Sequence, residues 1–140
     1  MSSAMIFQFM AEQWVLIAAL ATTLTLLALH ESRKAGPALS ISEAVQLVND
    51  EGGVFLDIRE AQEFARGHIT AALNIPAGSL ASRIGELEKL RETPVVVVCK
   101  MGQSAGSATK TLRQQGFSRA QKLAGGMMEW EAQKLPVVKQ

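Results

Sequence analysis

One residue of this sequence is a candidate nucleophile. Cys99 directly follows the apolar run Pro94–Val98 and precedes a turn, KMGQS, in which Gly102 permits backbone angles that a side chain forbids. A helix is predicted to begin near Ala105. Successive N–H groups of such a loop, followed by a helix N-terminus, bind anions and favour a thiolate over a thiol. The pattern therefore predicts an activated cysteine that faces an anionic substrate, with Lys100 adding positive potential.

The alternative interpretation of Cys99 is a small core residue at a strand end, which is common for a lone cysteine. The strand, cysteine, glycine-containing loop and helix together favour the functional interpretation, but phosphatases, arsenate reductases and sulfur transferases all use versions of this arrangement. With a single cysteine, an internal disulfide and a multi-cysteine metal site are both excluded. The two histidines, His30 and His68, are too few for a three-histidine zinc site.

The elements that must position Cys99 alternate between strands and helices. Four consecutive valines, Val95–Val98, predict a strand that is covered on both faces, as in the middle of a parallel sheet. Strands are predicted at 54–58, 72–76, 94–99 and 121–123, and helices at 42–49 (capped by Ser42), 60–66, 80–90, 105–115 and 127–133. This alternation predicts an α/β fold, an open parallel sheet with helices on both faces. Ligands bind such sheets outside the carboxyl ends of the strands, where Cys99 is expected.

Composition and charge exclude several classes of protein. The 140 residues suffice for one ordinary domain, and with 48% hydrophobic and 19% charged residues the chain is not intrinsically disordered. A formal net charge of +1 excludes a strongly basic nucleic-acid binder. No nucleic-acid partner is therefore expected.

The N-terminal part of the chain is predicted to contain a transmembrane helix at about residues 13–30. These 18 residues carry no formal charge and would span ~27 Å as a helix, against a hydrocarbon core of ~30 Å. The hydroxyls of its three threonines can each bond to a carbonyl one turn back. A cleaved signal peptide and a buried core helix are the alternatives. Because Arg33 and Lys34 follow the helix, the N-terminus is expected outside and the body in the cytoplasm.

Three segments of the body resemble the rhodanese family of sulfurtransferases. These are FLDIREAQEFARGHITAALNIP (Phe55–Pro76), VVVVCKMGQSA (Val95–Ala105) and LAGGMMEW (Leu123–Trp130). The resemblance covers about residues 40 to 138. With the membrane helix, the chain resembles a group of bacterial inner-membrane rhodanese-like proteins. The implied organisation is an N-terminal segment at 1–30, a linker at 31–39 and a rhodanese-like domain at 40–140.

The resemblance implies a reaction at Cys99. Its thiolate attacks the outer sulfur of a donor such as thiosulfate, and the resulting persulfide passes its sulfur to cyanide or a thiol. The loop would surround the persulfide with N–H donors, without a metal or an organic cofactor. Its residues after the cysteine are Lys100, Met101, Gly102, Gln103, Ser104 and Ala105.

The length of the loop bears on the substrate. Related phosphatases carry a loop one residue longer that ends in arginine, so the six-residue loop Cys99–Ser104 favours sulfur over phosphate. Many rhodaneses have an arginine near this end, where this chain has Ser104 and Ala105. The hydroxyl of Ser104 is a candidate substitute.

The resemblance also assigns supporting roles. Asp57 and Arg59 are expected to hold the surroundings of the site by hydrogen bonds and an ion pair, and His68 to bond to nearby backbone. A tight turn is expected at Gly125 and Gly126, and Trp130 is expected to anchor the packing of the core. Glu63 and Arg66 are expected on a solvated helix face, where Arg66 could border the pocket. Met127 and Met128 are expected either in the core or at the mouth of the pocket.

The function predicted from these observations is a membrane-anchored sulfurtransferase in the bacterial inner membrane, with its domain in the cytoplasm. Its expected partners are a small anionic sulfur donor, a thiol or cyanide acceptor and the lipid bilayer, and another membrane protein is a further candidate. A rhodanese-like binding module for a membrane partner, with little or no catalysis, is the first alternative. A phosphatase or arsenate reductase is the second.

Overall fold

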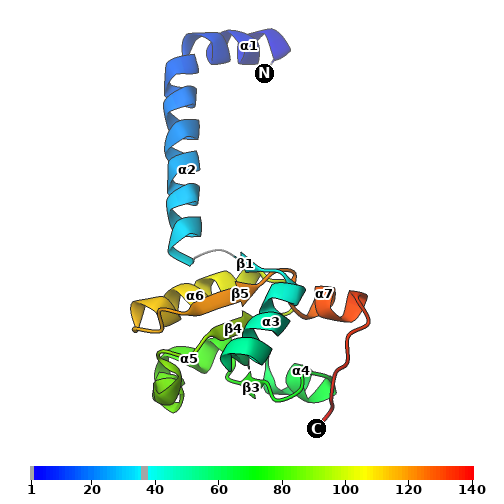
Figure 1. Cartoon of the computed structure of the whole chain (residues 1–140). Coiled ribbons are helices and arrows are strands. Elements are labelled where there is room, and N and C mark those ends of the chain that lie inside the picture. The colour runs from blue at the N-terminus through cyan, green and yellow to red at the C-terminus, as the bar shows by residue number, and fades with distance from the viewer. Residues whose placement is uncertain (1, 36–37) are drawn as a thin grey trace. The chain divides into compact units, whose positions relative to one another are not determined.

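The computed structural model describes residues 2–35 and 38–140, and the side chains of 2–30 and 38–140. The chain divides into two compact units, Met1–Lys34 and Ala35–Gln140 (Figure 1).

The first unit consists of two helices, α1 (Ser3–Glu12) and α2 (Trp14–Ala35). Among the described residues, no single helix is long and apolar enough to cross a membrane. The pair Ser3–Glu12 and Trp14–His30, bent by 74° at its break, has the length and composition to do so. Residues 31–35, within the predicted linker, continue α2. The threonine hydroxyls of α2 donate to carbonyls four residues earlier at 2.8 Å, as predicted: Thr22 to Ala18, Thr23 to Ala19 and Thr25 to Ala21.

The second unit is built on a parallel sheet of five strands in the order β1-β5-β4-β2-β3. The strands are β1 (Ala38–Leu39), β2 (Val54–Asp57), β3 (Leu73–Asn74), β4 (Val95–Val98) and β5 (Ala120–Leu123). The predicted open parallel sheet is therefore confirmed. The edge strand β1 was not predicted, because its two residues carry no strand pattern of their own and pair only with β5.

The helices lie near their predicted positions, with different ends. They are α3 (Ile41–Glu51), α4 (Ala61–Arg66), α5 (Leu80–Arg83), α6 (Gln103–Gln114) and α7 (Gly126–Ala132), with 3₁₀ segments η1 (Ala77–Ser79) and η2 (Ile84–Leu90). The predicted helix 80–90 is thus α-helical only in its first turn. The prediction that Ser42 caps the first helix is wrong. Ser40 is the cap, and it exchanges bonds with Glu43 in a capping box.

The four valines of β4 are all fully buried and alternate between two cores. Val95 and Val97 pack with residues of α5, η2 and α6 such as Leu80, Leu87 and Leu112. Val96 and Val98 pack on the opposite face with residues of α3 and α7 such as Ala44 and Trp130. Helices therefore cover both faces of the sheet, as the run of valines predicted (Figure 1).

Because all five strands are parallel, their carboxyl ends meet at one edge of the sheet. Asp57 ends β2 and Asn74 ends β3, while Cys99 follows β4 and Gly125 follows β5 by two residues. This edge brings together segments far apart in the sequence, and the candidate site lies there.

Candidate active site

Cys99 is buried, with 4% of its surface exposed, at the carboxyl end of β4. The backbone N–H of Gly102 donates to its Sγ at 2.9 Å. Gly102 has φ +93°, in the left-handed region that favours glycine, and α6 begins at the next residue. The sulfur therefore accepts a bond from backbone at the start of a helix, an arrangement that stabilises negative charge on it.

The loop after Cys99 is shorter than predicted, because α6 begins at Gln103 rather than near Ala105. Gln103, Ser104 and Ala105 belong to the first turn of α6, whose N–H groups have no acceptor within the helix. Most of the loop is open to solvent, since the side chains of Lys100, Met101, Gln103 and Ser104 are exposed, Gly102 is half-buried and Ala105 is buried.

The start of α7 is bonded to the loop. The N–H of Met127 donates to the carbonyl of Cys99 at 2.8 Å, and that of Met128 donates to the carbonyl of Lys100 at 2.9 Å. A Cβ on Gly126 would lie 2.2 Å from the carbonyl oxygen of Cys99, so only glycine fits there. The sequence predicted a tight turn at Gly125 and Gly126, but it did not predict that this turn packs directly on the cysteine loop.

Asp57 and Arg59 form a buried ion pair, with their side chains 1% and 9% exposed. Nη2 of Arg59 donates to Oδ2 of Asp57 at 2.7 Å and to the carbonyl of Gly67 at 2.8 Å. The side-chain amide of Asn74 donates to the carbonyls of Asp57 and Arg59 at 3.0 Å each. These contacts tie the ends of β2, β3 and α4 together, which fits the supporting role expected for the pair.

His68 is buried and bonded to nearby backbone. Its Nδ1 lies 2.7 Å from the carbonyl oxygen of Phe64, which can only accept, so Nδ1 carries the proton. The ring stacks on that of Phe64 at a centroid distance of 3.7 Å, and the backbone of His68 exchanges two bonds with Val138. His68 thus connects α4 to the C-terminal segment.

Trp130 is the packing anchor that the sequence predicted. It is 5% exposed, its ring meets that of Phe55 edge-on at 5.8 Å, and its Nε1 donates to the carbonyl of Pro136 at 3.0 Å.

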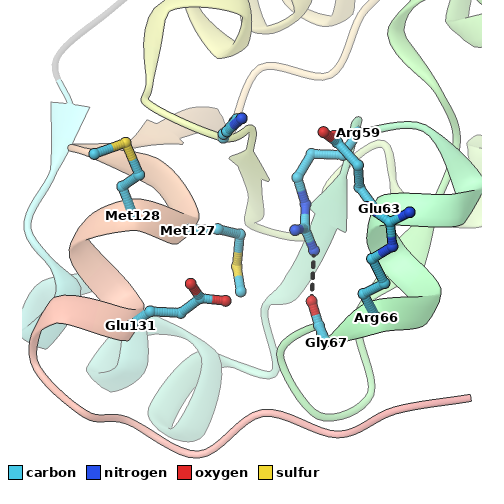
Figure 2. Close-up of a pocket in the computed structure, with 8 residues that line it drawn as sticks. Arg59, Glu63, Arg66, Gly67, Met127, Met128 and Glu131 are labelled. Atoms are coloured by element: carbon cyan, nitrogen blue, oxygen red, sulfur yellow. Dashed lines mark hydrogen bonds between the residues drawn. The ribbon is translucent and has the colours of Figure 1, made fainter.

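A pocket of about 180 Å³ opens beside the loop (Figure 2). Figure 2 shows Met127 and Glu131 of α7 on one side and Arg59, Glu63 and Arg66 on the other. The lining residues are Arg59, Glu63, Arg66, Gly67, Lys100, Met127, Met128 and Glu131. Met127, Met128 and Arg66 therefore line this pocket. Lys100 is the residue of the cysteine loop that also lines it.

The other end of the loop contributes to a different pocket. Ser104 lines a pocket of about 300 Å³ between η1, α5 and α6, together with Ala77, Leu80, Ala81, Ser107, Ala108 and Thr111. Cys99 and His68 are lining residues of neither pocket. The structure thus brings Arg59 and Lys100 to one pocket, and it leaves the catalytic role of Cys99 a prediction.

The described residues contain no group of three or more His, Cys, Asp or Glu side chains that could hold a metal ion. The polar group that contacts Sγ of Cys99 is the backbone N–H of Gly102. Such a donor suits an anion.

Comparisons with known proteins agree with this geometry. The chain is 35% identical over 98 residues to the uncharacterised protein YibN of Escherichia coli strain K12, covering 69% of this chain and 68% of YibN. It is 41% identical over 90 residues to the thiosulfate sulfurtransferase GlpE of Pseudomonas putida strain GB-1, covering 64% of this chain and 80% of GlpE. The solved structure of the human single-domain sulfurtransferase TSTD1 matches with a TM-score of 0.60 and 29% identity, covering 69% and 96% of the two chains.

The match to a family model decides the assignment. Residues 40–133, which hold strands β2 to β5, the cysteine loop and the Gly125–Gly126 turn, match the model of the rhodanese-like domain. The chain therefore belongs to the rhodanese family.

Proposed function

We propose that this protein is a sulfurtransferase that carries sulfur as a persulfide on Cys99. The observation that carries the proposal is the hydrogen bond from the N–H of Gly102 to Sγ of Cys99, 2.9 Å long, at the start of α6. An anionic sulfur is stabilised by such a donor, and both the thiolate and the persulfide are anions. The names of GlpE and TSTD1, both sulfurtransferases, support the same reaction class.

The first step loads the cysteine. The Cys99 thiolate attacks the outer sulfur of thiosulfate, a bond forms between the two sulfurs, and the sulfur–sulfur bond of thiosulfate breaks. Sulfite leaves with the electron pair of that bond. No proton is transferred, so the step needs no general base. The buried His68 therefore has no part in this step, and its bond to the Phe64 carbonyl is structural.

The second step unloads it. An acceptor nucleophile, cyanide or a thiolate, attacks the terminal sulfur of the persulfide, and the bond to Sγ breaks. Thiocyanate or a new persulfide leaves, and the Cys99 thiolate is regenerated. Thiosulfate is proposed as a donor because GlpE, 41% identical over 90 residues, is a thiosulfate sulfurtransferase and because Lys100 of the cysteine loop places a cation at the adjoining pocket.

We also propose that α2 anchors the protein in the bacterial inner membrane. The 18 uncharged residues at 13–30 and the length and composition of the bent pair of helices support this. Arg33 and Lys34 follow the apolar stretch, so the proposed orientation has the N-terminus outside and the rhodanese-like domain in the cytoplasm.

The test of sulfur transfer is the intact mass of the 140-residue chain in mild detergent. After incubation with thiosulfate, the mass should rise by one sulfur atom, and cyanide should remove that sulfur and yield thiocyanate. Cys99→Ser is the matched control, since it replaces one atom and should leave the fold intact. A folded protein with an alkylatable thiol that gains no sulfur would favour the alternative, a rhodanese-like module that binds a membrane partner.

The test of the anchor uses the same chain with a reporter fused after Gln140. Carbonate-washed membranes should retain the fusion, and a reporter that works only in the cytoplasm should be active. A reporter active only in the periplasm would reverse the orientation, and release by carbonate would contradict the anchor.

A further inference from the structure

The short helix α1 has two different sides. On a helix, residues four apart lie on the same side and residues two apart lie on nearly opposite sides. Ala4, Gln8 and Glu12 therefore share one side, and Gln8 donates to Glu12 along it at 3.2 Å. Phe9 and Phe7 flank the opposite side, which is formed by Ile6 and Met10, while Met5 lies beside Glu12. The large apolar side chains of α1 are between 44% and 76% exposed: Met5, Ile6, Phe7, Phe9 and Met10.

The break between α1 and α2 coincides with a change in polarity. Glu12 ends α1, Gln13 is the C-cap, and Trp14 begins the stretch of α2 that carries no formal charge up to Glu31. The two helices are bent by 74° at this point. Trp is a residue that concentrates at the boundary between hydrocarbon and water, and Glu avoids hydrocarbon. The break thus has the composition of a membrane boundary.

The lengths agree with a turn at that boundary. A straight helix from Ser3 to His30 would be ~42 Å long, whereas the hydrocarbon core is ~30 Å thick. The uncharged residues 13–30 alone would be ~27 Å long, close to the thickness of the core, and in the proposed anchor α1 then lies outside the span. Figure 1 shows α1 turned sharply away from the axis of α2, and the bend is 74°. If α2 crosses near the bilayer normal, α1 is therefore directed nearly along the membrane surface.

We infer that α1 lies in the headgroup region of the bilayer, with Ile6 and Met10 toward the acyl chains and Gln8 and Glu12 toward water. The inference rests on the proposed anchoring through α2, which it extends by a second lipid contact. In the proposed orientation, α1 rests on the outer leaflet.

The charge of α1 indicates how it binds. Surface helices that depend on anionic lipids carry Lys and Arg on the polar side. This sequence has no Lys or Arg before Arg33, and the charged side chain of α1 is Glu12. The helix is therefore held by its apolar side chains, and its depth should be the same in neutral and in anionic vesicles.

The experiment measures the depth of single spin labels. The 140-residue chain with Cys99→Ser, which removes the one native thiol, is given single cysteines and reconstituted into phosphatidylcholine vesicles. Met10→Cys and Gln8→Cys form one pair of opposite positions, and Ile6→Cys and Ala4→Cys form an independent second pair. Leu20→Cys, in the middle of α2, reports the span. The label's collision rate with oxygen, divided by that with a water-soluble nickel chelate, rises with depth.

The expected order of this ratio is Leu20 highest, Met10 and Ile6 intermediate, and Gln8 and Ala4 several-fold lower. Equal, low ratios at both sides of α1 with a high ratio at Leu20 would overturn the inference and leave the anchor standing. High ratios on both sides would overturn it as well, because α1 would then be immersed in the core. Low collision rates with both reagents at Met10 would indicate contact with protein and also overturn it. A low ratio at Leu20 would contradict the anchor itself.

Discussion

The backbone N–H of Met127 donates to the carbonyl of Cys99 at 2.8 Å, and this bond joins the start of α7 to the cysteine loop. The neighbouring Gly126 has φ +57°, and a Cβ there would meet the Cys99 carbonyl oxygen at 2.2 Å and the Gly102 nitrogen at 2.9 Å. Gly102 in turn supplies the N–H that reaches Sγ. The position of this donor to the sulfur therefore depends on a glycine more than twenty residues later.

Gly126→Ala should displace the loop and abolish most sulfur transfer. A side chain at positive φ costs about 1–3 kcal/mol. The contact with backbone adds to that, so we expect the free energy of unfolding to fall by more than about 2 kcal/mol. The rate at which thiosulfate adds sulfur to Cys99, measured by intact mass, should fall by much more than the increase in unfolded protein explains. Urea unfolding measures the stability separately.

Gly85→Ala is the matched control for this variant. A Cβ there has nothing within 4 Å, so the change should alter stability by less than about 1 kcal/mol and leave sulfur loading unchanged. Normal loading in a folded Gly126→Ala protein would mean that the loop does not need its contact with α7.

Asp57→Asn should destabilise the protein without changing the chemical step. The carboxylate is 1% exposed and pairs with Arg59, so its removal leaves a cation nearly buried and without its partner. Breaking a buried pair in this way costs about 3–5 kcal/mol. The midpoint of urea unfolding should fall accordingly, while the cyanide-dependent turnover of the folded fraction stays near that of the wild type.

A double variant distinguishes the effect of the ion pair on stability from a direct role of Asp57 in catalysis. Asp57→Asn combined with Arg59→Gln removes both charges, and it should recover part of the stability lost in Asp57→Asn. A turnover that collapses in the fully folded single variant would instead give Asp57 a direct part in catalysis.

Much of the fold could be predicted from local pattern. Four consecutive valines identify β4 as a central strand, because both faces of a strand must be covered to bury them all. The two-residue strand β1 carries too little pattern, and its pairing is decided by the neighbouring strand β5. The strand predicted at 72–76 is present as β3, although it is only two residues long. The cap at Ser40 was missed although its signal was present, since Glu43 stands three residues after Ser40 and completes a capping box.

The candidate site likewise has one part that follows from local sequence and one that depends on the tertiary fold. Cys99 and Gly102 lie within one short segment, so their relation to the start of α6 follows from the strand–loop–helix pattern. The pocket beside them is lined by Arg66 of α4 and by Met127 and Glu131 of α7, and no local pattern shows that these two helices line one pocket. Their common pocket depends on the strand order of the sheet.

Lys100→Met should raise the KM for thiosulfate. The side chain is exposed and lines the pocket beside the loop, so it attracts a dianion without touching the breaking bond. An exposed charge contributes about 0.5–1 kcal/mol, which corresponds to a rise in KM of roughly two- to fivefold with kcat little changed. Steady-state thiocyanate formation at several thiosulfate concentrations measures both constants.

Ionic strength and a remote lysine control for this effect. Added salt screens exposed charges, so the difference in KM between the wild type and Lys100→Met should shrink as salt is raised. Lys89→Met, which removes an exposed lysine on η2, should leave KM unchanged. Equal effects from the two lysines would mean that only net charge matters.

The capping box of α3 predicts a pH dependence of stability. Bonds from the backbone N–H and the hydroxyl of Ser40 hold the pKa of Glu43 below its usual value of 4.5. A carboxyl whose pKa is lower in the folded state stabilises the fold fully at pH values above its unfolded pKa. That contribution is lost as the pH falls through the folded pKa. Glu43→Gln should therefore be less stable than the wild type at pH 7, with the difference in the free energy of unfolding shrinking below about pH 4.5. Urea unfolding of both proteins from pH 7 to pH 3 measures this, and two parallel curves would mean that Glu43 has the same pKa folded and unfolded.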